Sequence, residues 1–157
     1  MLNPQNYIQR FSKYLSCGVF IISLDFEMYW GVRDKRSIDQ YKNNLHGIRK
    51  VVPILLDLFN ANDIHATWAT VGFLFFENRE DVRKNFPQLM PTYRREILSP
   101  YNYLNQTNDF ATECHFAPDL IKLISNYDGQ EIGTHTFSHY YCLEDGQCLS
   151  QFPSVPI

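Results

Sequence analysis

Two short stretches of the sequence contain side chains that could do chemistry, and they lie more than a hundred positions apart. The stretch SLDFEMYWG contains two carboxylates, Asp25 and Glu27. The stretch GTHTFSHYY contains two histidines, His135 and His139. Carboxylate oxygens and imidazole nitrogens are common ligands of divalent transition metals. If the fold brings the two stretches together, they could hold a metal ion and leave one carboxylate free to act as a base.

Three segments are predicted to be β-strands. They are residues 19–24 (VFIISL), 64–70 and 131–137. The first is a short, mainly apolar run behind a glycine, which is typical of a parallel strand covered on both faces. The acidic pair therefore follows the first strand, and the histidine pair lies at the end of the third.

Helices are predicted between these strands. Residues 41–59 place apolar side chains at spacings of three and four, with Asp39 as a candidate cap and Pro53 as an expected kink or restart. Short helices are expected after the second strand, and residues 116–128 are predicted to form a further helix. Residues 87–113 contain three prolines and several asparagines and are predicted to be a long loop.

The alternation of strands and helices predicts the fold class. It is typical of an α/β protein with parallel strands joined by crossover helices, in a layer or a barrel. Ligands of such folds bind at the carboxyl ends of the strands. Both chemically interesting stretches are thus expected at the same edge of the sheet.

The spacing of the two residues in each pair limits the backbone conformations in which both could bind one ion. Asp25 and Glu27 would point to the same side of an extended strand, about 6.5 Å apart. His135 and His139 would be roughly 13 Å apart on a continuous strand, too far for one ion with bonds of about 2.1 Å. A strand that ends at Thr136 and coils into a helical turn would make the two imidazoles neighbours.

Each pair alone has an ordinary explanation. An isolated Asp-x-Glu is explained by a helix cap and a solvated carboxylate, and an isolated HxxxH by two core or surface histidines. The expected position of both pairs at one edge favours a metal site instead. Two imidazoles and one carboxylate form an open three-ligand set that leaves a position for water.

The combination of motifs resembles the polysaccharide deacetylases, the NodB-homology or carbohydrate esterase family four group. HTFSH, residues 135–139, has the form H-[ST]-x-x-H of the second motif of that family. The first motif of the family is more often two adjacent aspartates, whereas this chain has Asp-x-Glu. HATWATVGF also resembles the second strand of the family, and the resemblance covers roughly residues 18–145.

The resemblance implies a fold and an activity. The fold would be the N-terminal part of a distorted (β/α) barrel of the glycoside hydrolase and deacetylase type. Three strands cannot close a barrel, and the later arginine and histidine motifs of the family are not found. Residues 1–157 are therefore predicted to be a single, incomplete domain with an irregular tail at 146–157. The implied activity is metal-dependent hydrolysis of the N-acetyl group of an amino sugar or polysaccharide, which releases acetate.

The resemblance also implies roles for individual residues. Asp25 would be the general base, and Glu27, His135 and His139 would hold a divalent metal, Zn²⁺ or else Co²⁺, Ni²⁺ or Fe²⁺. The one-residue spacer leaves open an exchange of roles between the two acids. The aromatic pair Tyr29 and Trp30 follows on the same edge, where the two rings could stack on a sugar or pack in the core.

Two other functions are compatible with the motifs. The chain could be a truncated fragment that binds metal without catalysing a reaction. Asp-x-Glu after an apolar strand also opens the DEDD-type 3′–5′ exonucleases. Such an enzyme needs a later histidine followed closely by aspartate, and the acids after His139 are only Glu144 and Asp145.

Composition limits the partners and the location. The chain has 157 residues, 45% hydrophobic and 20% charged, which is ordinary for one globular domain. With a net charge of −3 and no run of Lys or Arg, no nucleic-acid partner is expected, and the expected partner is a carbohydrate. No apolar run is long enough for a transmembrane segment, and no signal peptide is visible. We therefore expect a cytoplasmic or membrane-proximal protein.

Overall fold

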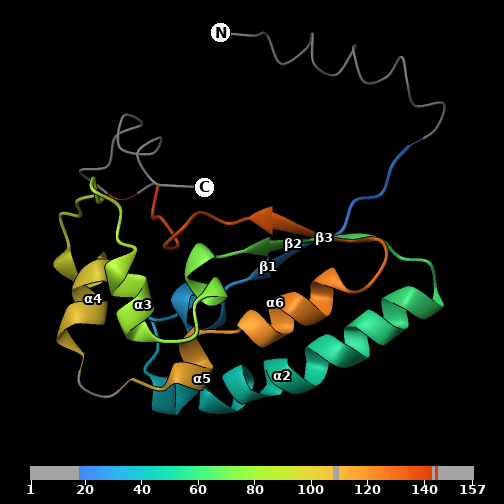
Figure 1. Cartoon of the computed structure of the whole chain (residues 1–157), viewed down its shortest axis with the longest axis horizontal. Helices are drawn as coiled ribbons and strands as arrows, with labels where there is room; N and C mark the ends of the chain where they lie inside the picture. The colour runs from blue at the N-terminus through green and yellow to red at the C-terminus, as the bar shows by residue number, and fades with distance from the viewer. Residues whose placement is uncertain (1–17, 108–109, 143, 145–157) are drawn as a thin grey trace, which may run out of the picture.

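Three parallel strands form one sheet in the order β1-β2-β3. The computed structural model describes residues 18–107, 110–142 and 144 (Figure 1). The strands are β1 (Ser23–Phe26), β2 (Ala66–Thr70) and β3 (Gln130–Thr134). This confirms the predicted α/β class with parallel strands, whereas its assignment as the N-terminal part of a distorted (β/α) barrel stays a prediction. The predicted tail at 146–157 lies outside the described residues.

Helices connect the strands, and the carboxyl ends of all three strands point to the same side of the molecule (Figure 1). The α-helices are α2 (Ile38–Ala61), α3 (Arg79–Lys84), α4 (Pro100–Gln106), α5 (Thr112–His115) and α6 (Pro118–Ser125). Short 3₁₀ segments are η1 (Met28–Gly31), η2 (Gly72–Phe75) and η3 (Glu96–Leu98). None of the helices in the described ranges is long and apolar enough to cross a membrane.

The two faces of the sheet differ in chemistry. Leu24, Trp68 and Ile132 are paired in register and join the apolar core, and α2 and α6 lie on one side of the sheet (Figure 1). Alternate positions carry polar or small residues, because successive strand residues point to opposite faces. One such row is Asp25, Ala69 and Gly133, and the next is Ser23, Thr67 and Glu131. Asp25 thus stands beside the small side chain of Ala69, and the row continues to Gly133 on β3.

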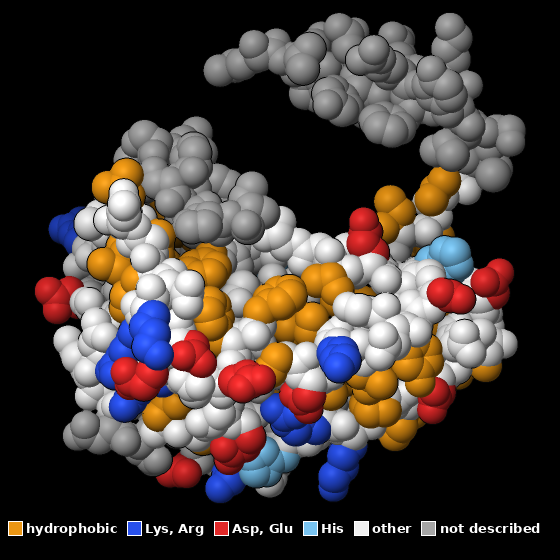
Figure 2. Space-filling view, viewed as in Figure 1, with side chains coloured by type: hydrophobic (Ala, Val, Ile, Leu, Met, Phe, Trp, Pro, Cys, Tyr) orange, Lys and Arg blue, Asp and Glu red, His pale blue; other side chains and the backbone are white. Residues whose placement is uncertain are grey.

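The outer surface of α2 is partly apolar. Val51, Ile54 and Leu58 are exposed there, and apolar side chains appear among charged ones over α2 and α6 in Figure 2. The opposite side of the helix is buried through Leu45, Leu56 and other core residues. Helix α2 is therefore apolar on more than the single stripe that the spacing predicted.

The first strand begins later than predicted. The backbone N–H of Thr67 donates to the carbonyl of Ile22, and regular pairing starts at Ser23. Upstream, Val19 to Ile21 are more than half exposed. The prediction of a strand over 19–24 was wrong at its start because the neighbouring strand β2 does not extend far enough to pair with these residues.

Helix α2 begins at a different residue from the one predicted. Its cap is Ser37, whose Oγ accepts a hydrogen bond from the backbone N–H of Gln40. The Gln40 side chain accepts in return from the Ser37 backbone N–H, which completes a capping box. Asp39, the predicted cap, lies inside the first turn, and the helix runs through Pro53 without a restart.

The long loop predicted for residues 87–113 contains helical segments η3 and α4 and the start of α5. Ser99 caps α4 by accepting from the N–H of Asn102, and Pro100 occupies the first turn. Serine followed by proline is a helix-start signal that the prediction did not use. The other predicted helices are present, with Pro118 in the first turn of α6.

Candidate metal centre

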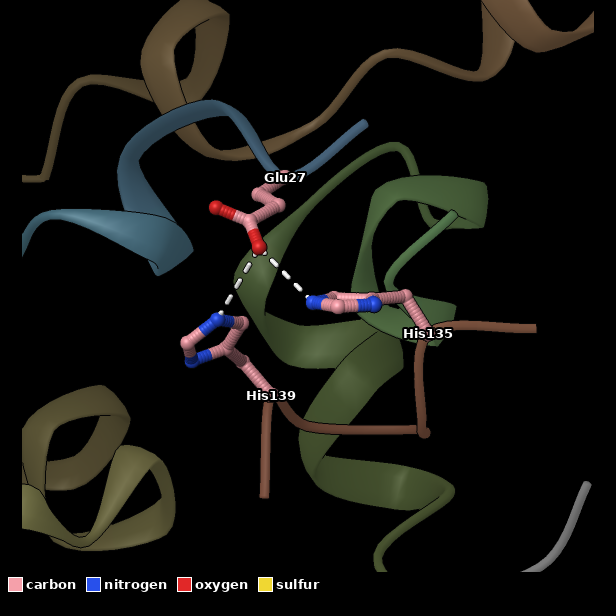
Figure 3. Close-up of side chains that lie close together, drawn as sticks. All are labelled: Glu27, His135 and His139. Carbon is pink, nitrogen blue, oxygen red and sulfur yellow. Dashed lines mark hydrogen bonds and ion pairs between the residues drawn. The ribbon is translucent and has the colours of Figure 1, made fainter. Parts of the chain in front are cut away.

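Three predicted ligands converge at the carboxyl ends of the strands (Figure 3). Glu27 Oε1 lies 2.7 Å from Nε2 of His135 and 3.2 Å from Nε2 of His139. All three side chains are partly buried. The structure thus brings together two segments 112 positions apart in the chain.

Glu27 reaches this position from a turn and not from a strand. Strand β1 ends at Phe26, and Glu27 caps the 3₁₀ segment η1. Its carboxylate lies over Gly31, where a Cβ atom would be 1.7 Å from Glu27 Oε2. The glycine therefore provides the space for the carboxylate. Gly31 was not predicted, because a glycine in a predicted loop gives no signal of such a contact.

The two histidines are brought together by a bend and not by the predicted helical turn. His135 continues the pairing beyond β3, because its N–H donates to the carbonyl of Thr70. The chain then turns at Thr136, with φ of 64°, and His139 has φ of 55°. Both lie in the left-handed region, which non-glycine residues rarely adopt. The spacing of the pair was informative, but the predicted backbone was wrong.

Neighbouring hydrogen bonds hold this strained bend. Tyr140 N–H donates to Thr136 Oγ1 at 2.8 Å. The backbone N–H groups of Gly72 and Phe73 donate to the carbonyls of Thr136 and Phe137. A Cβ atom on Gly72 would lie 2.9 Å from Phe137 Cα, so a side chain there would separate the two segments. Strained backbone persists where the surroundings fix it in this way, and it is concentrated at functional sites.

Asp25 lies beside the three ligands. Its Oδ1 is 3.9 Å from Nδ1 of His135, and its side chain is 63% exposed. Glu27 contacts both histidines at Nε2, whereas Asp25 faces the other nitrogen of one of them. The two acids thus occupy different positions: one is between the imidazoles and the other is open to solvent.

The electrostatics favour an ionised Glu27. A hydrogen bond from His139 lowers the pKa of the Glu27 carboxyl below its ordinary value, and the charges of both imidazoles lower it further. Burial opposes this shift without cancelling it. The carboxylate is therefore negatively charged at neutral pH, as a metal ligand must be.

The donor set fits a divalent ion of the Zn²⁺ type. Ligands at about 2.1 Å from a tetrahedral ion are separated by roughly 3.4 Å. The 3.2 Å separation of Glu27 and His139 is close to this value, whereas the 2.7 Å separation of Glu27 and His135 requires a small outward shift. His139 Nδ1 is buried without a hydrogen-bond partner among the described residues. The ring is fixed instead by edge-to-face contact with Tyr141.

Tyr29 and Trp30 lie in the core and not on a surface that a sugar could reach. They are 5% and 0% exposed. Tyr29 Oη donates to the carbonyl of Arg36, and Trp30 Nε1 donates to the carbonyl of His115. The structure corrects the substrate-binding prediction, because other side chains, including Phe73 against Trp30, already cover the rings.

A half-buried arginine near the site was not predicted. Arg33 Nη1 donates to the carbonyl of Ile97, and Nη2 donates to that of Leu98. Its guanidinium lies 6.0 Å from the ring centre of Tyr141, the residue that packs against His139. Arg33 thus connects η3 to the segment that carries the histidines. Its position in a polar predicted loop gave no sign of this role.

His115 is fully buried in a set of aromatic rings. Its Nδ1 lies 2.7 Å from the carbonyl oxygen of Ala111, which can only accept, so Nδ1 carries the hydrogen. Its Nε2 then accepts from the hydroxyl of Tyr103 at 2.9 Å. Burial is the main cause that lowers the pKa of His115 to about 4. The ring is therefore neutral at physiological pH.

This buried histidine should make stability depend on pH. Since the pKa is lowered on folding, the unfolded state binds the proton more strongly, and stability falls with pH from about 6.5 towards about 4. We expect wild type to lose about 3 kcal/mol more unfolding free energy than His115→Gln between pH 7 and pH 4. Urea unfolding at several pH values measures this. The exposed His65→Gln should behave as wild type, and equal losses in wild type and His115→Gln would contradict the prediction.

Comparisons with protein-family models, with curated proteins and with solved structures give no match to this chain.

Proposed function

We propose that the chain is a metal-dependent deacetylase that hydrolyses the N-acetyl group of an amino sugar or polysaccharide and releases acetate. The observation that carries the proposal is the convergence of Glu27, His135 and His139, with the exposed carboxylate of Asp25 beside them. The HTFSH motif and the acidic pair support the same activity through their resemblance to the polysaccharide deacetylases.

Each residue has a distinct task in the proposed reaction. Glu27, His135 and His139 would hold a divalent ion, which lowers the pKa of water and polarises a carbonyl group when bound. Asp25 would accept the proton of the attacking water as the new carbon–oxygen bond forms. The protonated Asp25 could then return this proton to the leaving nitrogen as the amide bond breaks. Acetate and a free amine result.

The surroundings of Asp25 support access by a broad substrate. Its neighbour across the sheet is Ala69, which pairs in turn with Gly133, and both residues project almost nothing above the sheet surface. A pyranose ring could approach the carboxylate over these residues. The proposed substrate class, N-acetylated amino sugars and polysaccharides, is defined by the chemistry of the site and is not limited to one sugar.

A metal-binding fragment without catalysis is the second candidate. The exposure of Asp25 favours it, because a base open to water lacks the low-dielectric surroundings that strengthen electrostatic catalysis. The exonuclease alternative has less support. It would use both acids as ligands, and it gives no role to the two histidines that contact Glu27.

Metal content and acetate release together test the proposal. We expect the purified full chain to retain Zn²⁺ by mass spectrometry and to release acetate from N-acetylglucosamine oligomers. The His135→Ala, His139→Ala double variant should lose both properties, because only one ligand remains. His65→Ala is the matched control, since His65 precedes β2 at the opposite end of the sheet.

The outcomes separate the candidates. Metal without acetate release would support the inert fragment. Equal metal content in the double variant and in wild type would contradict the site itself. Release of nucleotides from single-stranded DNA, lost in Asp25→Ala, would favour the exonuclease.

A further inference from the structure

A second group of metal-ligating side chains lies away from the site described above. Ligand atoms of His46, Glu113 and Cys114 all lie within 4.8 Å of one another. His46 comes from α2, and the other two come from α5. None of these residues takes part in the proposed deacetylase centre.

The short helix α5 is held firmly in place. The carbonyl of His115 accepts from Trp30 Nε1, and the imidazole of His115 stacks on Phe110 with ring centres 3.9 Å apart. Arg49 of α2 donates to the carbonyls of Phe116 and Glu113 at the end of α5. The segment that carries Glu113 and Cys114 is thereby tied directly to the helix that carries His46. This arrangement fixes the backbone that carries the ligands before an ion binds, which reduces the cost of assembling them.

The three side chains differ in their exposure to solvent, and this difference would let an ion enter the group from solvent. Cys114 is completely buried against Leu45 and Tyr29. The side chains of His46 and Glu113 are 44% and 53% exposed. An ion could therefore enter past the two exposed ligands and reach the thiol beneath them.

The ordinary explanation treats these residues separately. Cys114 would be a small core residue, and His46 and Glu113, with Nε2 and Oε1 3.9 Å apart, would be a surface ion pair. That explanation gives no reason for the ligand atoms of all three residues to lie within 4.8 Å of one another. A thiolate, an imidazole and a carboxylate within one small region form a mixed donor set that favours Zn²⁺ and similar ions.

We propose that His46, Glu113 and Cys114 form a second divalent metal site, of the Zn²⁺ or Co²⁺ type, with a thiolate ligand. The site joins α2 to α5 and is independent of the proposed deacetylase activity. The thiol loses its proton when the metal–sulfur bond forms, and this proton passes to solvent. Burial and then the negative charge of Glu113 raise the pKa of the Cys114 thiol in the absence of metal, and the positive charges of Lys42 and Arg49 oppose this shift.

Cobalt provides a direct test, since thiolate coordination to Co²⁺ gives a charge-transfer band in the near ultraviolet. The first site has only nitrogen and oxygen ligands, so this band should report the second site alone. We expect the full chain to bind two equivalents of Co²⁺ and to show the band. Cys114→Ser should lose the band and one equivalent. The His135→Ala, His139→Ala variant should keep the band and lose the other equivalent.

Two further variants keep the test decisive if Cys114→Ser fails to fold. His46→Ala changes an exposed side chain, and we expect it to weaken the thiolate-linked Co²⁺ binding at least tenfold. A Cys17→Ser, Cys142→Ser, Cys148→Ser variant keeps Cys114 as its only thiol and should retain the band. Absence of the band in wild type, its loss in the triple variant, or unchanged affinity in His46→Ala would overturn the proposal.

Discussion

Replacing Asp25 by asparagine should lower acetate release by about a hundredfold to ten-thousandfold, while the chain keeps its metal. The substitution preserves size and removes the carboxylate that would accept the proton of water. Glu27, His135 and His139 are unchanged, and Asp25 Oδ1 lies 3.9 Å from His135 Nδ1 and not at the nitrogen that faces Glu27. This expectation depends on the proposed function.

The measurement pairs kcat for acetate release with metal content of the same sample. Asp63→Asn is the matched control, because its side chain is almost fully exposed and its φ of 52° suits asparagine. Loss of metal together with activity in Asp25→Asn would assign Asp25 as a ligand and exchange the roles of the two acids. Full activity in Asp25→Asn would refute its role as the base.

Replacing Gly31 by alanine should weaken metal binding by about tenfold to a hundredfold without unfolding the chain. The new methyl group would lie 1.7 Å from Glu27 Oε2 and 3.0 Å from Glu27 Cβ. The carboxylate, at the end of a flexible side chain, would have to rotate away from the histidines. Gly31 does not have a positive φ, so alanine should fit its backbone.

Competition against a chelating dye would measure the metal affinity, and circular dichroism would follow the fold. Gly47→Ala is a suitable control, since no atom lies within 4 Å of a Cβ built there and it lies within α2. Alanine favours helix over glycine, so this variant should be at least as stable as wild type. Wild-type affinity in Gly31→Ala would show that the position of Glu27 is not critical.

Local patterns in the sequence were sufficient to predict the α/β class of the fold. The apolar runs predicted strands at positions that overlap β1, β2 and β3, and the spacing of apolar residues predicted α2 and α6. The boundaries were less predictable, because strand ends depend on the length of the partner strand. The start of β1 shows this, since its pairing begins only where β2 is available.

The burial of Tyr29 and Trp30 could not be read from their own neighbourhood. Trp30 is covered by Phe73, Tyr103 and His115, which lie far along the chain. The histidine spacing did predict that the two imidazoles lie together, but the left-handed backbone of Thr136 could not be expected from a β-branched residue. That conformation depends on hydrogen bonds from Gly72, Phe73 and Tyr140.

The separation of Glu27 from His139 along the chain has a consequence for folding. An ion held by both would close a loop of 112 positions, as a covalent cross-link does. The entropy of closing such a loop is worth about 4 kcal/mol. The folded chain has already closed that loop, so an ion would bind the folded state more tightly than the unfolded chain and would stabilise it by mass action. Through the bound ion, Glu27 and His139 would then also link the chain that follows β1 to the chain that follows β3.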